Sequence, residues 1–547
     1  MAAADVPAER TLFVRKATGL VKGWSVFDAF IYSAFAINLM ALGFGYAFTG
    51  VAVFPSGGLI AAIILSGLFV LFEVLTYASM IAVMPRAGGD YVWQTRVFGG
   101  GVGFVLAATG WWFILWHWVP IYANILILEV IQPVLNVLGY NGTSTLHAAW
   151  WNPAHGTGIF VASLFTAGLA TVVVSIGMRG YARFQKLCFY GAMLGLLIML
   201  AVFLFHSKAD FQAAFNRQTD IYGSNDPNAF QGTQQAAHSA GVGLKSFTAF
   251  PFRDTFLLVP FMLFYNLWPN WGATLYGEVR GASDFRKNIY AMGGALVFTT
   301  IAVVVTFAAM AHAMGFQFYG ILSSEYWATV TKAPTYWFPY PGMLAAMFFH
   351  NGLVQVILLL LLSLWFFGWA GSVFLSSTRV IFAAAFDRVL PEWAAKVDDR
   401  THVPLGALAL MLIPSIPISA LYAYDTKFYG YTLDATVVIA ITYLGTTLSA
   451  IVLPWRKPDI YRASPIARYE LAGIPLVTLS GVVFGAFLLF CGYKWFFDSA
   501  YGVNHRASLY YMAVLYVIAI AIYVISRVAR AREGIDLAKI NSEIPVE

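Results

Sequence analysis

Long stretches without charged side chains alternate along this chain with short polar segments. Residues 29–72, for example, contain no Asp, Glu, Lys or Arg, and the sequence PSGG at 55–58 divides them in two. A helix needs about 20 mostly apolar residues to cross the roughly 30 Å hydrocarbon core of a bilayer. The pattern therefore predicts twelve membrane-spanning helices, at residues 24–48, 58–83, 100–136, 158–178, 187–206, 255–276, 288–314, 352–382, 404–422, 433–453, 472–492 and 507–527.

The composition also indicates a membrane protein. Hydrophobic residues make up 60% of the 547 positions and charged residues 11%, and the mean hydropathy is +0.72. A soluble domain carries about 25% charged residues because its surface faces water. We therefore expect an all-α polytopic membrane protein whose exterior meets the lipid bilayer. The two cysteines, Cys188 and Cys491, lie inside apolar runs and are expected to be core residues rather than a disulfide or a metal pair.

The distribution of basic side chains predicts the orientation of the spans. If the N-terminus is cytoplasmic, eight of the 32 Lys and Arg residues fall in outer segments and the other 24 in inner segments. Cytoplasmic loops carry such an excess of Lys and Arg. We expect a multi-pass protein of the cell membrane with both termini cytoplasmic and the polar stretch 207–253 outside. This placement accounts for the net charge of +6 without a nucleic-acid partner.

Two of the predicted spans contain residues that interrupt helices. Residues 263–272 read LFYNLWPNWG, with Asn266, Pro269, Asn270 and Gly272 near the middle of the sixth span. Proline removes a backbone donor and glycine adopts non-helical torsions. The segment is either a proline kink or a discontinuous helix whose free backbone groups bind a ligand. The first span, with Asn38 and Gly43, gives weaker evidence for a break because it contains no proline.

Four segments resemble the amino acid–polyamine–organocation (APC) superfamily of permeases. They are MPRAGGDYVW at 84–93, YGEVRGASDFRKNI at 276–289, STRVIFAAAFDRVLPEWAAKVDDRTHVPLGAL at 377–408 and, more weakly, PWRKPDIYRASP at 454–465. They follow one another in the order of that family. The resemblance implies a LeuT-type fold that works by alternating access around a site between broken spans 1 and 6.

The resemblance also implies a division of the chain. Two inverted five-helix repeats would occupy 24–206 and 255–453, and two additional C-terminal helices would occupy 454–530. The remaining parts would be cytoplasmic tails at 1–23 and 531–547 and an external loop at 207–254.

The resemblance carries over to particular residues only in part. Counting back from Arg280 places Phe264 at the family's gating aromatic position, and Tyr265, Asn266 and Leu267 at the unwound segment. Counting forward from Asp28 places the break of span 1 at Ile37, Asn38 and Leu39. The family usually has a Gly-x-Gly element there, whereas this chain has no glycine between Ser33 and Met40.

Further candidate residues have both a functional and a structural interpretation. Glu73 is a carboxylate deep in the second span; it is either a coupling residue that carries a proton or a structural side chain bonded to a neighbouring helix. His117 lies near the level of the expected site, as a substrate contact or a satisfied structural histidine. Ser376 and Ser377 fall where LeuT-fold relatives bind sodium, although helix serines also bond to their own backbone. Five charged residues are expected to build the inner gate and loop ion pairs: Arg86, Asp90, Glu278, Arg379 and Asp387.

These features predict a secondary active transporter for amino acids, coupled to H⁺ or Na⁺ or working by exchange. The missing glycines of span 1 prompt the alternative of a polyamine, another organic cation or a nucleobase-like substrate. A channel or a transport-dead sensor on the same fold is an alternative of another class. We expect no enzyme, cofactor or metal centre, because the chain has no phosphate loop, HExxH, GxSxG or paired metal-ligand cluster.

Overall fold

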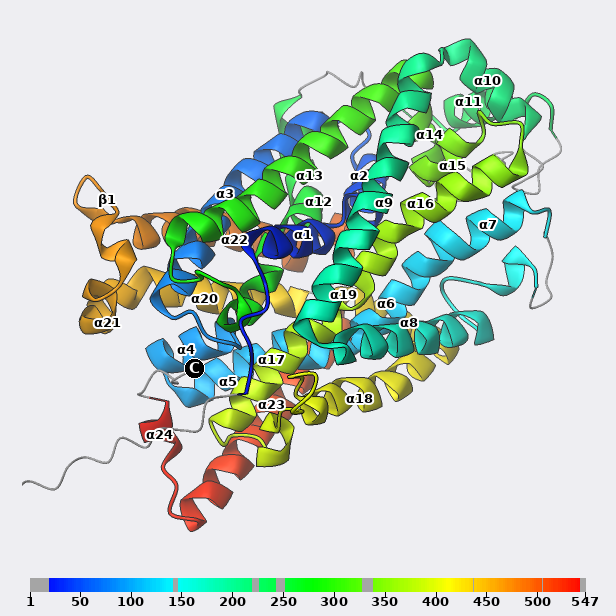
Figure 1. Ribbon diagram of the computed structural model, residues 1–547. Coiled ribbons are helices and arrows are strands. Elements are labelled where there is room, and N and C mark those ends of the chain that lie inside the picture. Colours follow the sequence, from blue (N-terminus) through cyan, green and yellow to red (C-terminus); the bar gives the residue numbers. More distant parts are fainter. Residues whose placement is uncertain are drawn as a thin grey trace, which may run out of the picture.

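The computed structural model describes residues 19–140, 146–218, 226–242, 251–326, 338–435, 437–503 and 505–541. These residues form a bundle of long helices with one two-stranded hairpin, β1 (Glu470–Leu471) and β2 (Ile474–Pro475) (Figure 1). Apolar helices of this length keep every backbone donor paired within the hydrocarbon core, which is what a membrane-spanning segment requires.

The described chain agrees closely with the twelve predicted spans. Eleven helical segments are long and apolar enough to cross a bilayer, and the twelfth is the interrupted sixth span. In chain order the spans are α1–η1–α2 (Val26–Ile37, Leu39–Phe44 and Gly45–Val53), α3 (Leu59–Val83), α5–η2–α6–η3–α7 (Gly100–Ala108, Thr109–Phe113, Ile114–Leu126, Ile127–Ile131 and Gln132–Val137), α8 (Thr157–Ser175), α9 (Gly177–Phe205), α12 with η6 (Phe252–Asn266 and Pro269–Glu278), α13 (Phe285–Ala313), α16–α17 (Gly352–Ala370 and Ser372–Phe386), α18 (Leu405–Tyr424), α20 (Val437–Arg456), α22 (Leu476–Phe497) and α23 (Arg506–Arg532).

The predicted boundaries differ from the observed ones mainly at α9. This helix begins at Gly177 rather than at 187, so Arg179, Arg183 and Lys186 lie in its first three turns. Hydropathy marks only the part of a helix that meets hydrocarbon, whereas the helical hydrogen bonds continue into the polar interface.

Shorter helices gather at the two ends of the bundle. One end carries α10 (Lys208–Arg217), α11 (Ala229–Ser239), α14 (Phe316–Tyr326) and α15 (Pro341–Ala346) (Figure 1). The other end, which we call the terminal face, carries both ends of the described chain, the β1–β2 hairpin, α21 (Pro458–Arg462) and α24 (Leu537–Ile540). The described helices of the predicted external loop thus lie opposite the chain ends.

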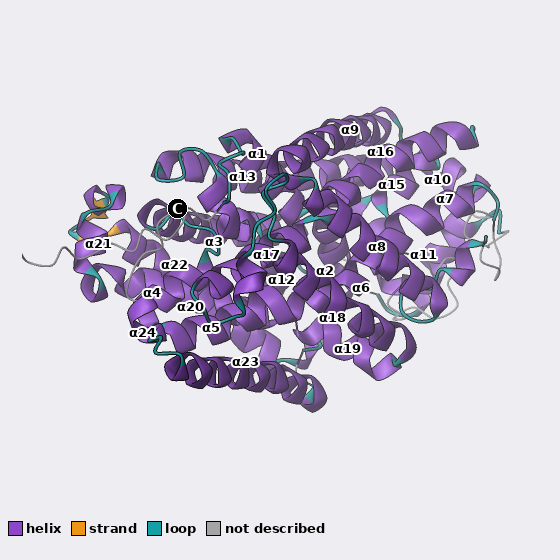
Figure 2. Ribbon diagram, turned by 60° about the horizontal axis from the view of Figure 1, so that its bottom comes forward, coloured by secondary structure: helices purple, strands orange, loops and turns teal. Residues whose placement is uncertain are grey.

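The first span lies at the centre of the bundle and the last at its edge. The most apolar window of span 1 is 83% buried inside the protein, whereas that of α23 is 17% buried. Figure 2 shows α23 running along one side of the bundle. Groups that act on a solute must therefore be sought around span 1.

Candidate functional site

The first span is broken at Asn38. Helix α1 ends at Ile37, Asn38 adopts a left-handed conformation with φ of 44°, and the chain resumes at Leu39 as the π-helical turn η1. Asparagine is among the few residues besides glycine that tolerate this conformation. Its side-chain oxygen accepts a hydrogen bond of 3.2 Å from the Ala41 amide and so caps the second half of the helix. Asn38 therefore makes the break in a segment that lacks the family's glycines.

The sixth span is broken at Leu267 and Trp268. Helix α12 ends at Asn266, and the 3₁₀ segment η6 starts at Pro269. Proline has no amide hydrogen to continue the helix. The Trp268 indole donates to the Phe264 carbonyl, one of the acceptors that the helix end leaves free.

The two breaks lie against each other. Ser33 of α1 donates a 2.8 Å hydrogen bond to the carbonyl of Pro269. A Cβ atom on Gly43 would lie 3.0 Å from the Tyr265 ring, so the spans also touch beyond the break. The rings of Tyr46 and Phe264 stack with centroids 5.2 Å apart.

Aromatic rings of spans 3, 6 and 10 surround the break in span 6. We call Trp111, Trp118, Trp268, Trp271 and Tyr443 the aromatic cluster. Its ring centroids are 4.9 Å apart for Trp111 and Trp271, 5.2 Å for Trp118 and Trp268, and 6.0 Å for Trp111 and Tyr443. Such faces can hold apolar side chains and, through cation–π interaction, an ammonium group.

The two serines of span 8 are already engaged by protein groups. Ser376 Oγ donates to the Trp271 carbonyl at 3.0 Å and is 2.6 Å from the Tyr32 hydroxyl. Ser377 Oγ donates to the Val373 carbonyl of its own helix at 2.8 Å. The family resemblance suggests a sodium site between spans 1 and 8. The Tyr32 hydroxyl lies in that space and bonds to Ser376.

Several fully buried polar atoms around the break of span 6 make no hydrogen bond within the described residues. They belong to the Glu73 carboxylate, the amide of Asn270, the side-chain oxygen of Asn266 and the hydroxyls of Tyr265 and Tyr443. The other end of the Asn266 amide donates to the Ile63 carbonyl at 3.3 Å. Buried polar atoms are nearly always paired, so orphaned ones point to a ligand or to ordered water.

Asp90 does not belong to the loop ion pairs expected for it. It is fully buried and accepts hydrogen bonds from Tyr77 Oη (2.7 Å), Thr446 Oγ1 (2.6 Å) and Trp111 Nε1 (3.1 Å). No cation among the described residues forms an ion pair with it. Asp90 thus faces the aromatic cluster rather than the gate.

Three other expected gate residues form buried ion pairs. Arg379 binds both carboxylate oxygens of Glu278, at 2.7 and 3.1 Å. Asp387 binds Arg96 at 2.5 and 3.0 Å, a partner that the motifs did not suggest. Arg86 is half-buried and donates to the Pro85 carbonyl at 3.2 Å.

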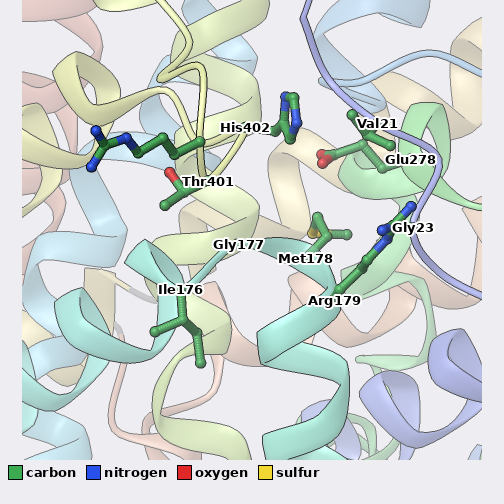
Figure 3. Close-up of a pocket in the computed structure, with 10 residues that line it drawn as sticks. Val21, Gly23, Ile176, Gly177, Met178, Arg179, Glu278, Thr401 and His402 are labelled. Atoms are coloured by element: carbon green, nitrogen blue, oxygen red, sulfur yellow. The ribbon is translucent and has the colours of Figure 1, made fainter.

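The Glu278–Arg379 pair lies at the end of η6 nearest the terminal face. Trp24 pairs there with Val279 as an isolated parallel bridge, and its indole donates to the Met178 carbonyl at 2.8 Å. A cavity of about 240 Å³, which Glu278 lines, opens beside the pair. Figure 3 shows Thr401 and His402 on one side of this cavity and Met178 and Arg179 on the other. Glu278 thus belongs both to a buried ion pair and to the lining of this cavity.

His117 lies outside the region of the two breaks. Its Nδ1 bonds to the Phe113 carbonyl at 2.9 Å, its Nε2 bonds to the Tyr511 hydroxyl, and its ring stacks on Phe428. Both ring nitrogens are satisfied by protein groups, with Tyr511 on the peripheral helix α23. The structural interpretation of this histidine therefore replaces the substrate contact.

Helix α14 covers the second half of span 1 at the end away from the terminal face. The Tyr319 hydroxyl donates to the Phe44 carbonyl at 3.3 Å, and Ser323 donates to the Phe48 carbonyl. Helix α14 thus lies on one side of the breaks, and the Glu278–Arg379 ion pair lies on the other.

Sequence reasoning missed part of this region. Asn270 stood within the recognised WPNW segment but was not singled out as a site residue, and Trp111, Trp271 and Tyr443 gave no signal because aromatic residues are frequent along the whole chain. A second buried carboxylate within a span, Glu129 in η3, was also missed.

The chain matches known proteins over most of its length. A family profile described as amino acid permease matches residues 27–520. The branched-chain amino acid permease BcaP of Lactococcus lactis subsp. cremoris is 21% identical over 476 residues, which cover 86% of this chain and 87% of that protein. Asc-type amino acid transporter 1 of Mus musculus is 26% identical over 420 residues, which cover 76% of this chain and 66% of the mouse protein. The two breaks agree with a LeuT-type fold, and the profile spans far more than half of the chain, so this protein is a member of the amino acid permease family within the APC superfamily.

Proposed function

We propose that this protein transports amino acids across the cell membrane by alternating access, with the substrate held between the breaks of spans 1 and 6. The observation that carries the proposal is the contact of two discontinuous helices at a buried point lined by orphaned polar atoms. Broken helices leave backbone N–H and C=O groups free at membrane depth, where they can bind the carboxylate and ammonium of an amino acid. The two relatives, a branched-chain amino acid permease and an amino acid transporter by name, support the same substrate class.

The residues proposed to line the substrate site are those at the two breaks. They are Ile37, Asn38 and Leu39 in span 1 and Phe264, Tyr265, Asn266 and Leu267 in span 6. We add Asn270 and the aromatic cluster to this proposal, because the Asn270 amide is a buried orphan and the rings surround the break.

A purified, reconstituted protein provides the direct test. Proteoliposomes loaded with an unlabelled amino acid should take up the labelled form faster than empty ones at equal pH on both sides. A channel would give uptake that neither saturates nor responds to the internal load, and a transport-dead sensor would give none.

We propose that Glu73, rather than the serines of span 8, carries the coupling ion, and that the ion is a proton. Glu73 is fully buried and accepts no hydrogen bond from any described residue, whereas Ser376 and Ser377 already bond to Trp271 and Val373. A lone carboxylate at membrane depth resists ionisation, so it takes up a proton more readily than one in water. Transport driven by a pH gradient but not by a sodium gradient would support this assignment.

The aromatic cluster and the buried carboxylates Glu73 and Asp90 favour one alternative substrate class, an organic cation such as a polyamine. A ring face and an anionic side chain together stabilise a cation that lacks a carboxylate. Thermal-shift measurements with amino acids and with diamines separate the two classes, because a ligand stabilises the state that it binds.

A further inference from the structure

Asp90 joins four separate parts of the bundle. It is the first residue of α4 (Asp90–Phe98), and its donors come from α3 (Tyr77), η2 (Trp111) and α20 (Thr446). Oδ1 accepts both hydroxyl bonds and Oδ2 accepts the indole bond. A carboxylate that accepts three hydrogen bonds at a helix N-terminus is stabilised in its ionised form.

Glu73 lies within electrostatic reach of Asp90 and has the opposite hydrogen-bonding situation. It precedes Tyr77 by one helical turn on α3, is equally buried and has no described donor. The negative charge of Asp90 acts on Glu73, and both carboxyl groups act electrostatically on the Tyr443 hydroxyl. Two like charges in a shared dry environment cannot both be ionised without a large cost. The hydrogen bonds therefore assign the charge to Asp90 and the proton to Glu73.

The surroundings leave this pair without a counter-charge. The two buried cations of the described chain, Arg96 and Arg379, are held by Asp387 and Glu278. The other titratable groups that face the pair are two tyrosines, Tyr77 on α3 and Tyr443 on α20, whereas Tyr91 on α4 faces Asp387 and Arg96. Asp90 lies outside the membrane-spanning segments Leu59–Val83 and Gly100–Val137, and burial raises its pKa to about 6. A proton can therefore reach Asp90 near neutral pH.

We propose that Asp90 takes up a proton on acidification while Glu73 keeps its own, and that Asp90 is a positioning residue that transmits its change of charge to the substrate site through its bond to Trp111. The inference extends the proposed function, because it assigns the coupling site a route to the aromatic cluster.

The chemistry of the three donors explains the transmission. When Asp90 takes up a proton from acidified water, one O–H bond of a hydronium ion breaks, one O–H bond forms on the carboxylate, and the negative charge of Asp90 is lost. The hydroxyls of Tyr77 and Thr446 can rotate and become acceptors of the new O–H group, but an indole N–H can only donate. Its bond to Asp90 changes from charge-assisted to neutral and weakens. Trp111, packed 4.9 Å from Trp271, is thereby released from the carboxyl group next to the break.

A spectroscopic titration tests this inference without any transport assay. Infrared spectra of the purified full-length protein report protonated carboxyl groups by their C=O stretch. One band should persist at neutral pH and disappear in Glu73→Gln, and a second should appear on acidification and be absent from Asp90→Asn. Absence of the acid-induced band, or its persistence in Asp90→Asn, would overturn the proton uptake assigned to Asp90.

The hydrogen bond from Trp111 to Asp90 is tested by the near-ultraviolet circular dichroism of Trp111. The difference spectrum between wild type and Trp111→Phe should change with the same pH midpoint as the acid-induced carboxyl band. Thr446→Val is the matched control, because it removes a different donor of Asp90 and should leave this pH-dependent Trp111 signal in place. A Trp111 signal that is constant with pH, or that still changes in Asp90→Asn, contradicts the proposal.

The test does not depend on the folding of Asp90→Asn. If Asp90→Asn does not fold, the comparison of wild type with Trp111→Phe still decides whether Trp111 follows the titration. Removal of one charge-assisted donor should also raise the carboxyl midpoint of Trp111→Phe, by up to about one to two pH units. Failure of the proposed function would appear only in the counterflow assay, and failure of this inference only in the spectra.

Discussion

Ser33 in the first span donates a 2.8 Å hydrogen bond to the carbonyl of Pro269, the first residue after the break in the sixth span. Proline cannot continue the ladder of α12, and the Pro269 carbonyl is met by a side chain from the other broken helix. The two interruptions therefore stabilise each other. A change at either break should affect both.

The left-handed conformation of Asn38 gives the first prediction. Asn38→Ala loses the cap on Ala41 and places a Cβ-restricted residue at φ of 44°. The combined cost is about 1–3 kcal/mol of folding stability. Both variants lose the side-chain bonds to the Ala41 amide and the Trp365 carbonyl, but Asn38→Gly keeps the backbone freedom and should cost less than Asn38→Ala. Thermal unfolding of the two purified variants checks this order, and equal unfolding temperatures would contradict the role assigned to the backbone.

Sequence alone could predict the two breaks because Pro269 and Asn38 act locally on the backbone. It could not predict the environment of Asp90. That residue follows Gly88 and Gly89, both at positive φ, and the Gly88 amide donates to the Thr274 carbonyl at 2.8 Å. The motif therefore packs into the bundle against η6 instead of remaining in a loop at the surface. This long-range contact leaves no periodicity in the sequence.

His117 shows a second limit of sequence reasoning. Its level along span 3 was predictable, but its direction depended on the π-helical turn η2 directly before it. A π-bulge inserts one residue into the helix and turns every later side chain by roughly 100°. The histidine consequently faces Tyr511 of α23 instead of span 6.

The orphaned oxygen of Asn266 gives the second prediction. If it binds substrate, Asn266→Ala should weaken binding by about 1–3 kcal/mol, the cost of a lost buried polar contact. Asn288→Ala is the control, because Asn288 is also buried but uses its amide to hold the Ala282 carbonyl at 2.8 Å. Substrate titration of both variants by calorimetry should show the loss only for Asn266. Unchanged affinity in a folded Asn266→Ala protein would move the site elsewhere.

Membrane orientation gives the third prediction. Ser239 in α11 and Ser283 after η6 are exposed at opposite ends of the bundle, and both native cysteines are buried. With cytoplasmic termini, Ser239→Cys should react with an impermeant maleimide in intact cells, and Ser283→Cys should react only after permeabilisation. The reverse pattern would invert the protein and contradict the reading of its Lys and Arg distribution.

The last prediction separates coupling from folding at Glu73. Glu73→Gln keeps the shape of the side chain but cannot gain or lose a proton, so the variant should fold and exchange substrate at equal pH. It should lose accumulation driven by a pH gradient, because no group then carries the proton as the bundle changes conformation. Glu129→Gln is the matched control: Glu129 is also buried within a span, but in η3, between α6 and α7 of span 3. That variant should keep gradient-driven uptake. Aggregation of Glu73→Gln would instead make Glu73 a structural anchor, and undiminished accumulation would place the coupling site at another residue.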